Sequence, residues 1–472
     1  MNPTRIVILG GGFAGTAIAQ RLERLFRGDA SIEITLLDSE NFFTFTPLLP
    51  EVPSGSIQPK HIVFPLRALL KRTRVRQASV KAIDVDRRTL TAAHCGACGD
   101  FTLPFDHVVL ALGSVPNFFG LPGVADHALT IKSLADATQL HAHIIDKLEH
   151  ADLQPDPAVR RQMLTFVVAG GGFAGVETIA ELNDFVRGAG RFYPHIQPEE
   201  IRLVLIHSGD RILPEVSDSL SRYALDKLRS RGVEVLLKTR VKSCTPHTVT
   251  LNDGEALNAH TFVWAAGTAP NPVLDLIPVA RSKSGRVQVD ATMAARDCSC
   301  IWAVGDSACV PDIVSGGDCP PTAQFALRQG RRLADNLAAT LRGDAPRPFR
   351  FKTLGLLAGL GRRSAVAEIF GLRFSGFFAW WLWRTIYLLK LPGFERKLRV
   401  AIDWTLDLFF PRDIVYLRPL HAVPGPPPVS HANQAENAAN CGFPSSPDRT
   451  TQPILEGVME FRPPLPALPA AR

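Results

Sequence analysis

One hexapeptide, Gly-Gly-Gly-Phe-Ala-Gly, occurs twice in the chain, at residues 10–15 and again at residues 170–175. Each copy follows an apolar run, at residues 6–9 and 166–169, and precedes a segment with helical character. A strand, the spacing G-x-G-x-x-G and a helix, in this order, form the dinucleotide-binding fingerprint. Its first glycine permits a tight turn, its second lets the backbone approach a pyrophosphate, and its third lets the helix pack on the strand. Two identical copies predict two dinucleotide sites rather than two structural turns.

The segments that follow the two loops are also arranged alike. After the first loop, an apolar strand at residues 34–37 ends in Asp38, where a carboxylate can accept hydrogen bonds from ribose hydroxyls. After the second loop, the corresponding strand at residues 203–206 ends in His207. In each half a later apolar strand leads to small residues, and these are Gly113 in the first half and Ala266 and Gly267 in the second.

This duplication predicts the α/β fold class, with two Rossmann-like dinucleotide-binding domains, one inserted in the other, and a C-terminal membrane-associating region. Residues 301–306 would return the chain to the first domain. We expect the first domain at residues 1–125 and 262–344, the second at 126–261, the C-terminal region at 345–420 and a disordered tail at 421–472.

Positive charge is concentrated near the C-terminal end of the predicted fold. Residues 342–418 contain 14 Lys or Arg against six Asp or Glu, together with four of the six tryptophans. Basic residues with clustered tryptophans favour the surface of an anionic membrane. No nucleic-acid recognition motif accompanies the basic residues, so we expect no nucleic-acid partner. The uncharged stretch at residues 374–383 is too short to span a bilayer, which needs about 20 apolar residues.

A helical segment after residue 394 is predicted to have two faces. Its charged face carries Arg396, Arg399, Asp403 and Asp407, and its apolar face carries Leu398, Ile402 and Leu406. The region from Trp380 to Trp404 has a second interpretation, a buried interface of a homodimer, because apolar aromatic patches also serve that purpose.

The eight cysteines show no secretory disulfide framework. Cys95 and Cys98 have the spacing of zinc ligands, but Cys298-x-Cys300 is irregular, and we predict no metal site. The N-terminal apolar run contains the first glycine loop, so a signal peptide is not expected. We therefore expect the protein on the cytoplasmic side.

The two loops, the Thr-Pro-Leu-Leu-Pro segment at residues 46–50, Gly305-Asp306 and Pro-Thr-Ala-Gln at residues 321–324 together resemble the type II NADH dehydrogenases. Members of this family are single-chain, FAD-dependent NADH:quinone oxidoreductases of the respiratory chain. The resemblance covers residues 1–420 and implies a non-proton-pumping enzyme, peripheral on the cytoplasmic face of the inner or plasma membrane. It also implies that residues 1–125 and 262–344 bind FAD and residues 126–261 bind NAD(P)H.

The same resemblance assigns cofactor roles to individual residues. FAD would be held by the first loop, by Asp38 and by residues around the flavin, which are Gly10, Gly12, Phe13, Ala14, Gly15, Asp38, Thr46, Gly113, Asp306 and Ala323. NADH would be held by Gly170, Gly172, Phe173, Gly175, Ala266 and Gly267. A helix start at Ala323, with Thr322 as its N-cap, would favour negative charge on a reduced flavin.

Two residues are expected to take part in catalysis. After the identical hexapeptides, the second loop continues to Glu177 where the first continues to Ala17. The resemblance implies that Glu177 lies near nicotinamide and flavin, whereas the alternative is a glutamate favoured by the helix dipole. It also implies that Gln324 faces the quinone, whereas the alternative is an ordinary polar residue in a first helical turn.

His207 departs from the acid that NADH-dependent proteins often carry at this strand end. No negative charge there opposes a 2′-phosphate, so we expect NADH with reduced discrimination, and NADPH use stays open. Two alternatives to NADH:quinone oxidoreduction also stay open. One is a sulfide:quinone or ferredoxin-type flavoprotein reductase. The other is a redox sensor that binds flavin and NADH but turns over slowly.

Overall fold

The structure, a computed structural model, describes residues 3–94 and 99–415, which belong to one compact unit. Cys95, Cys98 and the tail expected at 421–472 lie outside the described residues. None of the helices in the described part of the chain is long and apolar enough to cross a membrane.

The first glycine loop belongs to an eight-stranded sheet. Its strands are β1 (Thr4–Leu9), β2 (Ile32–Asp38), β5 (Arg74–Asp84), β6 (Thr89–His94), β7 (Asp100–Pro104), β8 (His107–Leu110), β20 (Ala294–Ala295) and β21 (Cys298–Ala303). They lie in the order β20-β21-β8-β1-β2-β5-β6-β7. The five strands from β21 to β5 run parallel, and the outer strands are antiparallel. Ile6 to Leu9 in the centre of this sheet are almost completely buried, as expected for a parallel strand covered on both faces.

The second glycine loop belongs to a five-stranded parallel sheet. Its strands are β10 (Leu129–Thr130), β11 (Thr165–Ala169), β12 (Arg202–Ile206), β13 (Val233–Leu236) and β17 (Thr261–Trp264), in the order β10-β17-β11-β12-β13. The expected domain boundary after residue 261 is wrong, because it cuts β17, whose residues pair with β11. The division belongs after this strand, where the chain leads into the antiparallel pair of β9 (Ser114–Pro116) and β18 (Thr268–Pro270).

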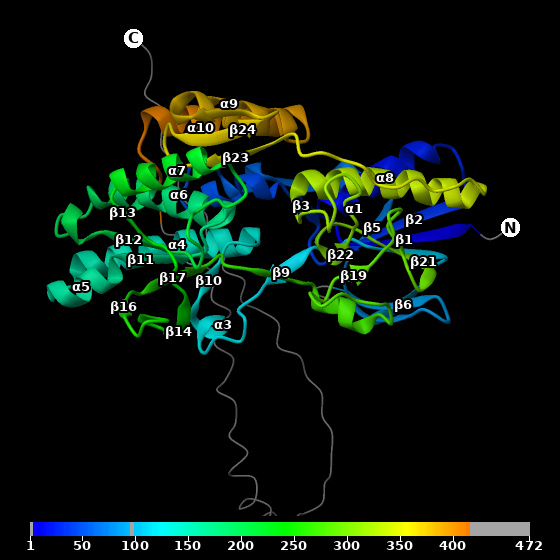
Figure 1. Cartoon of the computed structure of the whole chain (residues 1–472), viewed down its shortest axis with the longest axis horizontal. Coiled ribbons are helices and arrows are strands. Elements are labelled where there is room, and N and C mark those ends of the chain that lie inside the picture. Colours follow the sequence, from blue (N-terminus) through cyan, green and yellow to red (C-terminus); the bar gives the residue numbers. More distant parts are fainter. Residues whose placement is uncertain (1–2, 95–98, 416–472) are drawn as a thin grey trace, which may run out of the picture. The chain divides into compact units, whose positions relative to one another are not determined.

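Helices follow the strands as the loop pattern predicts. They are α1 (Phe13–Leu25), α2 (Leu66–Leu69), α3 (Val124–His127), α4 (Leu134–Leu153), α5 (Pro157–Met163), α6 (Phe173–Gly190), α7 (Asp218–Ser230) and α8 (Ala323–Arg342). The helix α1 follows β1, and α6 follows β11. Figure 1 shows α8 alongside α1, and the two helices are in extensive contact. A cradle for a dinucleotide therefore starts at the carboxyl end of one central strand in each sheet.

Short elements complete the two halves. The remaining strands are β3 (Phe42–Thr44), β4 (Val63–Pro65), β14 (Val241–Thr245), β15 (Thr248–Leu251), β16 (Ala256–Asn258), β19 (Val287–Gln288) and β22 (Ala308–Cys309). The 3₁₀ helices are η1 (Thr46–Glu51), η2 (Pro59–His61), η3 (Pro198–Glu200), η4 (Pro272–Leu276) and η5 (Gly305–Ser307). The element that bears on the site is η1, because it carries the Thr-Pro-Leu-Leu-Pro segment and ends at Glu51.

The C-terminal region is a small sheet with two helices. It contains β23 (Gly355–Gly359), β24 (Ala365–Ile369), β25 (Leu372–Ser375), α9 (Gly376–Lys390) and α10 (Phe394–Phe409). Figure 1 shows these yellow and orange elements beside α6 and α7, and contacts join β23 to α6 and β24 to α7. The C-terminal region therefore packs directly on the helix that starts at the second glycine loop.

The helix α10 buries Val400 and Trp404 together with acidic residues, and it leaves a second set of apolar residues exposed. Its apolar residues Leu398, Ile402 and Leu406 are 52%, 48% and 49% exposed. Its acidic residues point inward: Asp403 pairs with His61, and Asp407 is only 7% exposed. A helix on the surface of a protein in water normally buries its apolar stripe. Leu398, Ile402 and Leu406 therefore form an apolar surface that no described residue covers.

Candidate active site

The first glycine loop is closed so tightly that side chains are excluded. A Cβ on Gly15 would lie 1.8 Å from the carbonyl oxygen of Gly10. Gly10 itself has φ of +105°, and a Cβ there would lie 2.2 Å from the carbonyl oxygen of Ala111. By contrast, a Cβ on Gly12 would meet no atom within 4 Å. Gly12 is the N-cap of α1 and has no side-chain cap, so the first N–H groups of the helix remain available. This open, uncapped helix start fits a pyrophosphate.

Asp38 binds the backbone of the first loop. Its Oδ2 accepts a hydrogen bond from the backbone N–H of Gly11, and its Oδ1 accepts one from Glu40 at 2.8 Å. Burial raises the pKa of this carboxyl. A carboxylate has about four acceptor positions, so two bonds to the backbone leave capacity for ribose hydroxyls.

Residues far apart in the sequence meet the start of α1. A Cβ on Gly330 of α8 would lie 2.6 Å from the carbonyl oxygen of Ala14, so the two helices approach closely. A Cβ on Gly305 would lie 3.8 Å from that of Ala14. Beside Gly305, Oδ2 of Asp306 accepts a hydrogen bond from Ser114 Oγ at 2.6 Å. Ala14 and the Gly-Asp pair predicted from the sequence therefore lie together.

Three other predicted flavin residues are placed as follows. Gly113 has φ of +69°, in the left-handed region that favours glycine. A Cβ there would meet nothing within 4 Å. Phe13 packs edge-on against Phe43, with ring centroids 4.9 Å apart, in an aromatic cluster rather than on an open face. Thr46 is exposed at the start of η1.

The start of α8 is correctly predicted, but its cap is not. Thr322 occupies the N-cap position, yet its side chain makes no capping hydrogen bond, and its buried Oγ1 has no partner in the described part of the chain. The N–H groups at Ala323 and the residues after it are therefore free of a side-chain cap. Uncapped N–H groups favour a negative charge placed against them.

The second loop repeats the geometry of the first. A Cβ on Gly175 would lie 1.8 Å from the carbonyl oxygen of Gly170, while a Cβ on Gly172 would meet nothing within 4 Å. Here the residue that binds the loop is His207, whose Nδ1 accepts a hydrogen bond from the N–H of Gly171 at 3.1 Å. Phe173, the first residue of α6, is half-buried. The two loops therefore share one backbone design and differ in the side chain that closes it.

An aromatic ring lies at the end of the second site. A Cβ on Gly267 would come within 2.7 Å of the ring of Phe119, which is 61% exposed. Neighbouring Ala266 is exposed. The sequence analysis assigned no role to Phe119, because nothing local connects it to a glycine almost 150 residues away.

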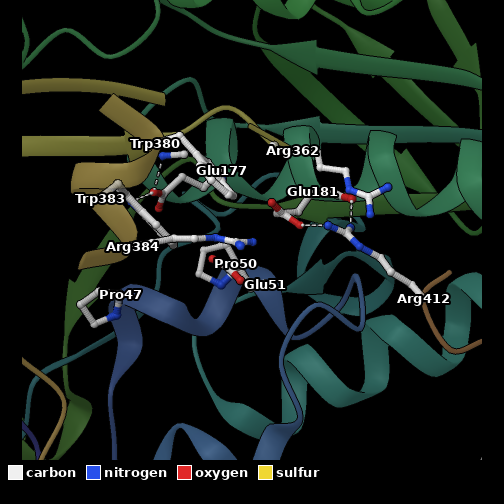
Figure 2. Close-up of a pocket in the computed structure, with 12 residues that line it drawn as sticks. Pro47, Pro50, Glu51, Glu177, Glu181, Arg362, Trp380, Trp383, Arg384 and Arg412 are labelled. Atoms are coloured by element: carbon white, nitrogen blue, oxygen red, sulfur yellow. Dashed lines mark hydrogen bonds and ion pairs between the residues drawn. The ribbon is translucent and has the colours of Figure 1, made fainter. Parts of the chain in front are cut away.

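Glu177 lies at the junction with the C-terminal region. Its Oε1 accepts hydrogen bonds from the N–H of Gly359 at 2.8 Å and from Trp383 Nε1 at 3.2 Å. Figure 2 shows this carboxyl beside Trp383 and Trp380. Burial raises the pKa of Glu177 to about 8. The side chain is thus a neutral acid at pH 7, held by donors from another part of the chain.

A cavity opens between η1, α6 and the C-terminal region. Figure 2 shows Glu181 and Arg412, two of the residues that line it, pointing toward each other. Their side chains form an ion pair with an N–O distance of 2.9 Å. The walls of the cavity are formed by Pro47, Pro50, Glu51, Glu177, Glu181, Gly359, Gly361, Arg362, Trp380, Trp383, Arg384 and Arg412. The empty space is small, enough for about one water molecule. Such a site can hold and exchange protons, because it brings carboxyl groups together away from bulk water.

Gln324 does not line this cavity. Its Nε2 donates to the carbonyl oxygen of Gly355 at 2.9 Å, and its Oε1 accepts from the N–H of Leu354 at 3.4 Å. The amide therefore ties the start of α8 to β23. Its predicted contact with quinone stays a prediction.

Glu51, Arg384 and Arg412 were not predicted from the sequence, and the fold brings them into the same cavity as Glu177. One signal was present: Glu177, Glu181 and Asp184 recur with helical spacing and share one face of α6. No signal in the sequence indicated that the C-terminal region would cover this face of α6.

Within residues 3–94 and 99–415 no group of three His, Cys, Asp or Glu residues is arranged to hold a metal ion. The Sγ atoms of Cys298 and Cys300 lie 3.0 Å apart. The expected absence of a metal stays a prediction, because Cys95 and Cys98 lie outside the described residues.

Comparisons with known proteins agree on one group. A family model described as pyridine nucleotide-disulphide oxidoreductase matches residues 4–330, and one described as NDH2 C-terminal domain matches residues 354–413. The type II NADH:quinone oxidoreductase Ndh of Mycobacterium tuberculosis is 31% identical over 86% of this chain and 89% of its own length. The demethylphylloquinone reductase NdbB of Synechocystis is 32% identical over 85% of this chain and 95% of its own length.

One solved structure shares the fold along its whole length. The structure of NDH2 from Plasmodium falciparum in complex with NADH matches with a TM-score of 0.81, covering 88% of this chain and 100% of that chain. The sequence identity is 20%, so this likeness concerns the fold alone.

Proposed function

Since the chain belongs to the pyridine nucleotide-disulphide oxidoreductases and, among them, to the type II NADH dehydrogenases, we propose that it takes hydride from NADH and passes two electrons to a membrane quinone through bound FAD. The observation that carries this proposal is the pair of identical loops at uncapped helix starts, each bound to the side chain that ends the next strand. Proton pumping forms no part of the proposed activity.

The first loop is the FAD site of this proposal. The N–H groups at the start of α1 bind the pyrophosphate, Asp38 accepts from the adenosine ribose, and Asp306 binds the part of the cofactor nearer the flavin. The uncapped N–H groups at Ala323 favour the negative charge of a reduced flavin. When bound, the flavin supplies hydride acceptance and electron release.

The second loop is the NADH site. The N–H groups at the start of α6 bind the pyrophosphate, and Glu177 orients the nicotinamide as a neutral acid. Because His207 is not an acid, NADPH is a second donor in the proposal, with NADH preferred. The first experiment mixes the purified protein with NADH or NADPH without oxygen and follows the flavin absorbance, then adds a quinone. Flavin bleaching followed by recovery on quinone addition is the expected result.

The same experiment separates the rival activities. Flavin that is bleached by sulfide and not by NADH would identify a sulfide:quinone reductase. Fast bleaching by NADH, followed by slow recovery with every quinone tested, would identify a redox sensor. The match of residues 354–413 to the NDH2 C-terminal domain favours the NADH:quinone activity.

The quinone side of the proposal is a peripheral contact with an anionic membrane. Large apolar side chains are exposed along α9 and α10, and these are Phe377, Phe378, Trp381, Leu389, Phe394, Leu398, Ile402, Leu406 and Phe409. Exposed Lys390 and Arg399 lie on the same two helices. An apolar face next to basic residues is the pattern of an interfacial helix. The cytoplasmic face of that membrane stays a prediction.

Vesicle binding tests this surface. Replacing Phe378, Trp381 and Ile402 with Ser should release the protein from sedimenting anionic phospholipid vesicles while NADH oxidation by a soluble acceptor persists. The control is Leu153→Ser, an apolar residue at the end of α4 that is 80% exposed and lies outside α9 and α10. If the triple variant instead stays on vesicles and a dimer of the parent protein becomes monomeric, the patch is the interface of a homodimer.

A further inference from the structure

Glu51 carries a buried carboxyl group. It belongs to neither glycine loop, and the proposed function gives it no role. It ends η1 and is 5% exposed in the cavity that Glu177 also lines. Its Oε2 accepts a hydrogen bond from Trp404 Nε1 at 2.7 Å. A residue of the first half is thus held by α10 of the C-terminal region.

The three carboxyl groups of the cavity differ in their partners. Glu181 pairs with Arg412 at 2.9 Å and accepts two serine hydroxyls. Glu177 accepts only neutral N–H donors, and Glu51 accepts the neutral indole N–H of Trp404. Neither Glu177 nor Glu51 has an ion pair within 4.0 Å among the described residues. A buried carboxyl without an ion pair retains its proton at neutral pH.

The surroundings of Glu51 also allow it to release that proton. The charged groups that face it are Glu181 on α6, Arg384 on α9 and Asp407 on α10. Burial and the charge of Glu181 raise its pKa to about 8, while Arg384 opposes the rise. The guanidinium of Arg384 lies 4.1 Å from the ring centroid of Trp380, and its Nε has no hydrogen-bond partner among the described residues. The positive charge of Arg384, which also lies 3.7 Å from Asp407, favours the Glu51 anion.

Quinone reduction needs one proton that NADH does not supply. A quinone that becomes a quinol gains two electrons and two protons, and NADH delivers two electrons with one proton as hydride. The balance is NADH + H⁺ + quinone giving NAD⁺ + quinol. The additional proton must cross from water to a site that excludes bulk water.

We propose that Glu51 holds this additional proton and releases it into the cavity toward Glu177 and the quinone. The O–H bond of the Glu51 carboxyl breaks, its electron pair stays on the carboxylate beside Arg384, and a proton from solvent later restores the acid. Both carboxyl groups line the same cavity, which has room for about one water molecule. This inference rests on the proposed quinone reductase activity and adds a proton-holding residue to it.

The test compares two glutamines introduced into the same cavity. Glu51→Gln keeps an oxygen for Trp404 Nε1 but carries no transferable proton. Anaerobic flavin reduction by NADH should be unchanged, whereas reoxidation by quinone should slow by about 100-fold, the usual contribution of a positioned acid. The reoxidation rate should also lose its break near pH 8.

Glu181→Gln is the matched control. It removes a negative charge that raises the pKa of Glu51, so the break should move to lower pH rather than disappear. Glu51→Asp, which keeps a carboxyl, should restore a break. A wild-type rate and pH profile in Glu51→Gln would overturn the inference.

An infrared titration of the oxidised holoprotein tests the proton without turnover. The C=O band of protonated carboxyl groups should be present at pH 7 and should lose part of its intensity in Glu51→Gln, with Glu177 supplying the remainder. If the parent protein fails to reduce any quinone, the proposed function fails. If it reduces quinone and Glu51→Gln does so equally well, only the role of Glu51 fails.

Discussion

His207 Nδ1 accepts a hydrogen bond from the backbone N–H of Gly171 at 3.1 Å. The position is equivalent to that of Asp38, whose Oδ2 accepts from Gly11. Because Nδ1 is the acceptor, the imidazole is neutral, and burial lowers its pKa, which keeps it so at pH 7. The second loop is thus closed without a negative charge.

His207→Asp should sharpen the choice between NADH and NADPH. The carboxylate can keep the bond to Gly171 and would repel the 2′-phosphate of NADPH, so kcat/KM for NADPH should fall about tenfold or more relative to NADH. His207→Asn, which offers an acceptor without charge, is the control and should leave the ratio near that of the parent. Equal ratios in all three proteins would show that this strand end does not face the 2′ position.

Gly12→Ala and Gly172→Ala should separate the two nucleotide sites. A Cβ at either position meets no protein atom within 4 Å, so both variants should fold. The methyl would occupy the space through which a pyrophosphate approaches the backbone. Gly12→Ala should therefore lose flavin, measured by the ratio of flavin to protein absorbance. Gly172→Ala should keep flavin and raise KM for NADH. Loss of flavin from both variants would contradict the assignment of the two loops.

Glu177→Gln should stabilise the protein at alkaline pH. The pKa of Glu177 is about 8 in the folded chain, above the usual value of about 4.3 for an unfolded one. As pH rises between these values, the unfolded state loses its proton while the folded state keeps it, so folding stability falls. Because glutamine does not titrate, the variant does not undergo this loss of folding stability, which is on the order of a few kcal/mol at about pH 8. The difference in Tm between variant and parent should be more positive at pH 8 than at pH 5, and a constant difference would contradict the buried neutral acid.

Arg384→Ala should loosen the C-terminal region. Arg384 lies between Trp380 and Trp404, with ring distances of 4.1 and 4.9 Å, and 3.7 Å from Asp407. Its removal takes a cation from a buried acidic cluster, at a cost of about 3 kcal/mol. A lower Tm and faster proteolysis after residue 345 are expected, whereas Arg373→Ala, at an exposed position of β25, should change neither. An unchanged Tm in Arg384→Ala would contradict this.

Much of the site was predictable because its signals are local. The glycine loops specify their own turn and helix start within six residues, and the strand ends at Asp38 and His207 follow from the apolar runs that precede them. A single glycine motif is weak evidence for a dinucleotide site, but two identical copies in one chain make the prediction specific. Residue-by-residue roles for Glu177 and Gln324 came from the family resemblance and stay predictions.

Other features were decided by contacts between distant segments. Strand β17 joined the second sheet, although the expected boundary cut it, because pairing with β11 depends on a segment almost 100 residues earlier. The spacing in α10 indicated two faces but not which one is buried. Asp403 and Asp407 turn inward because His61 and Arg412 meet them there.

The sequence by itself determined two nucleotide cradles, since a glycine turn and the helix after it depend only on neighbouring residues. Only the tertiary structure decided that Glu51 and Glu177 share a cavity and that the apolar face of α10 stays outside. Burial and ion pairing are set by what the rest of the chain brings alongside, and no short stretch of sequence contains that information.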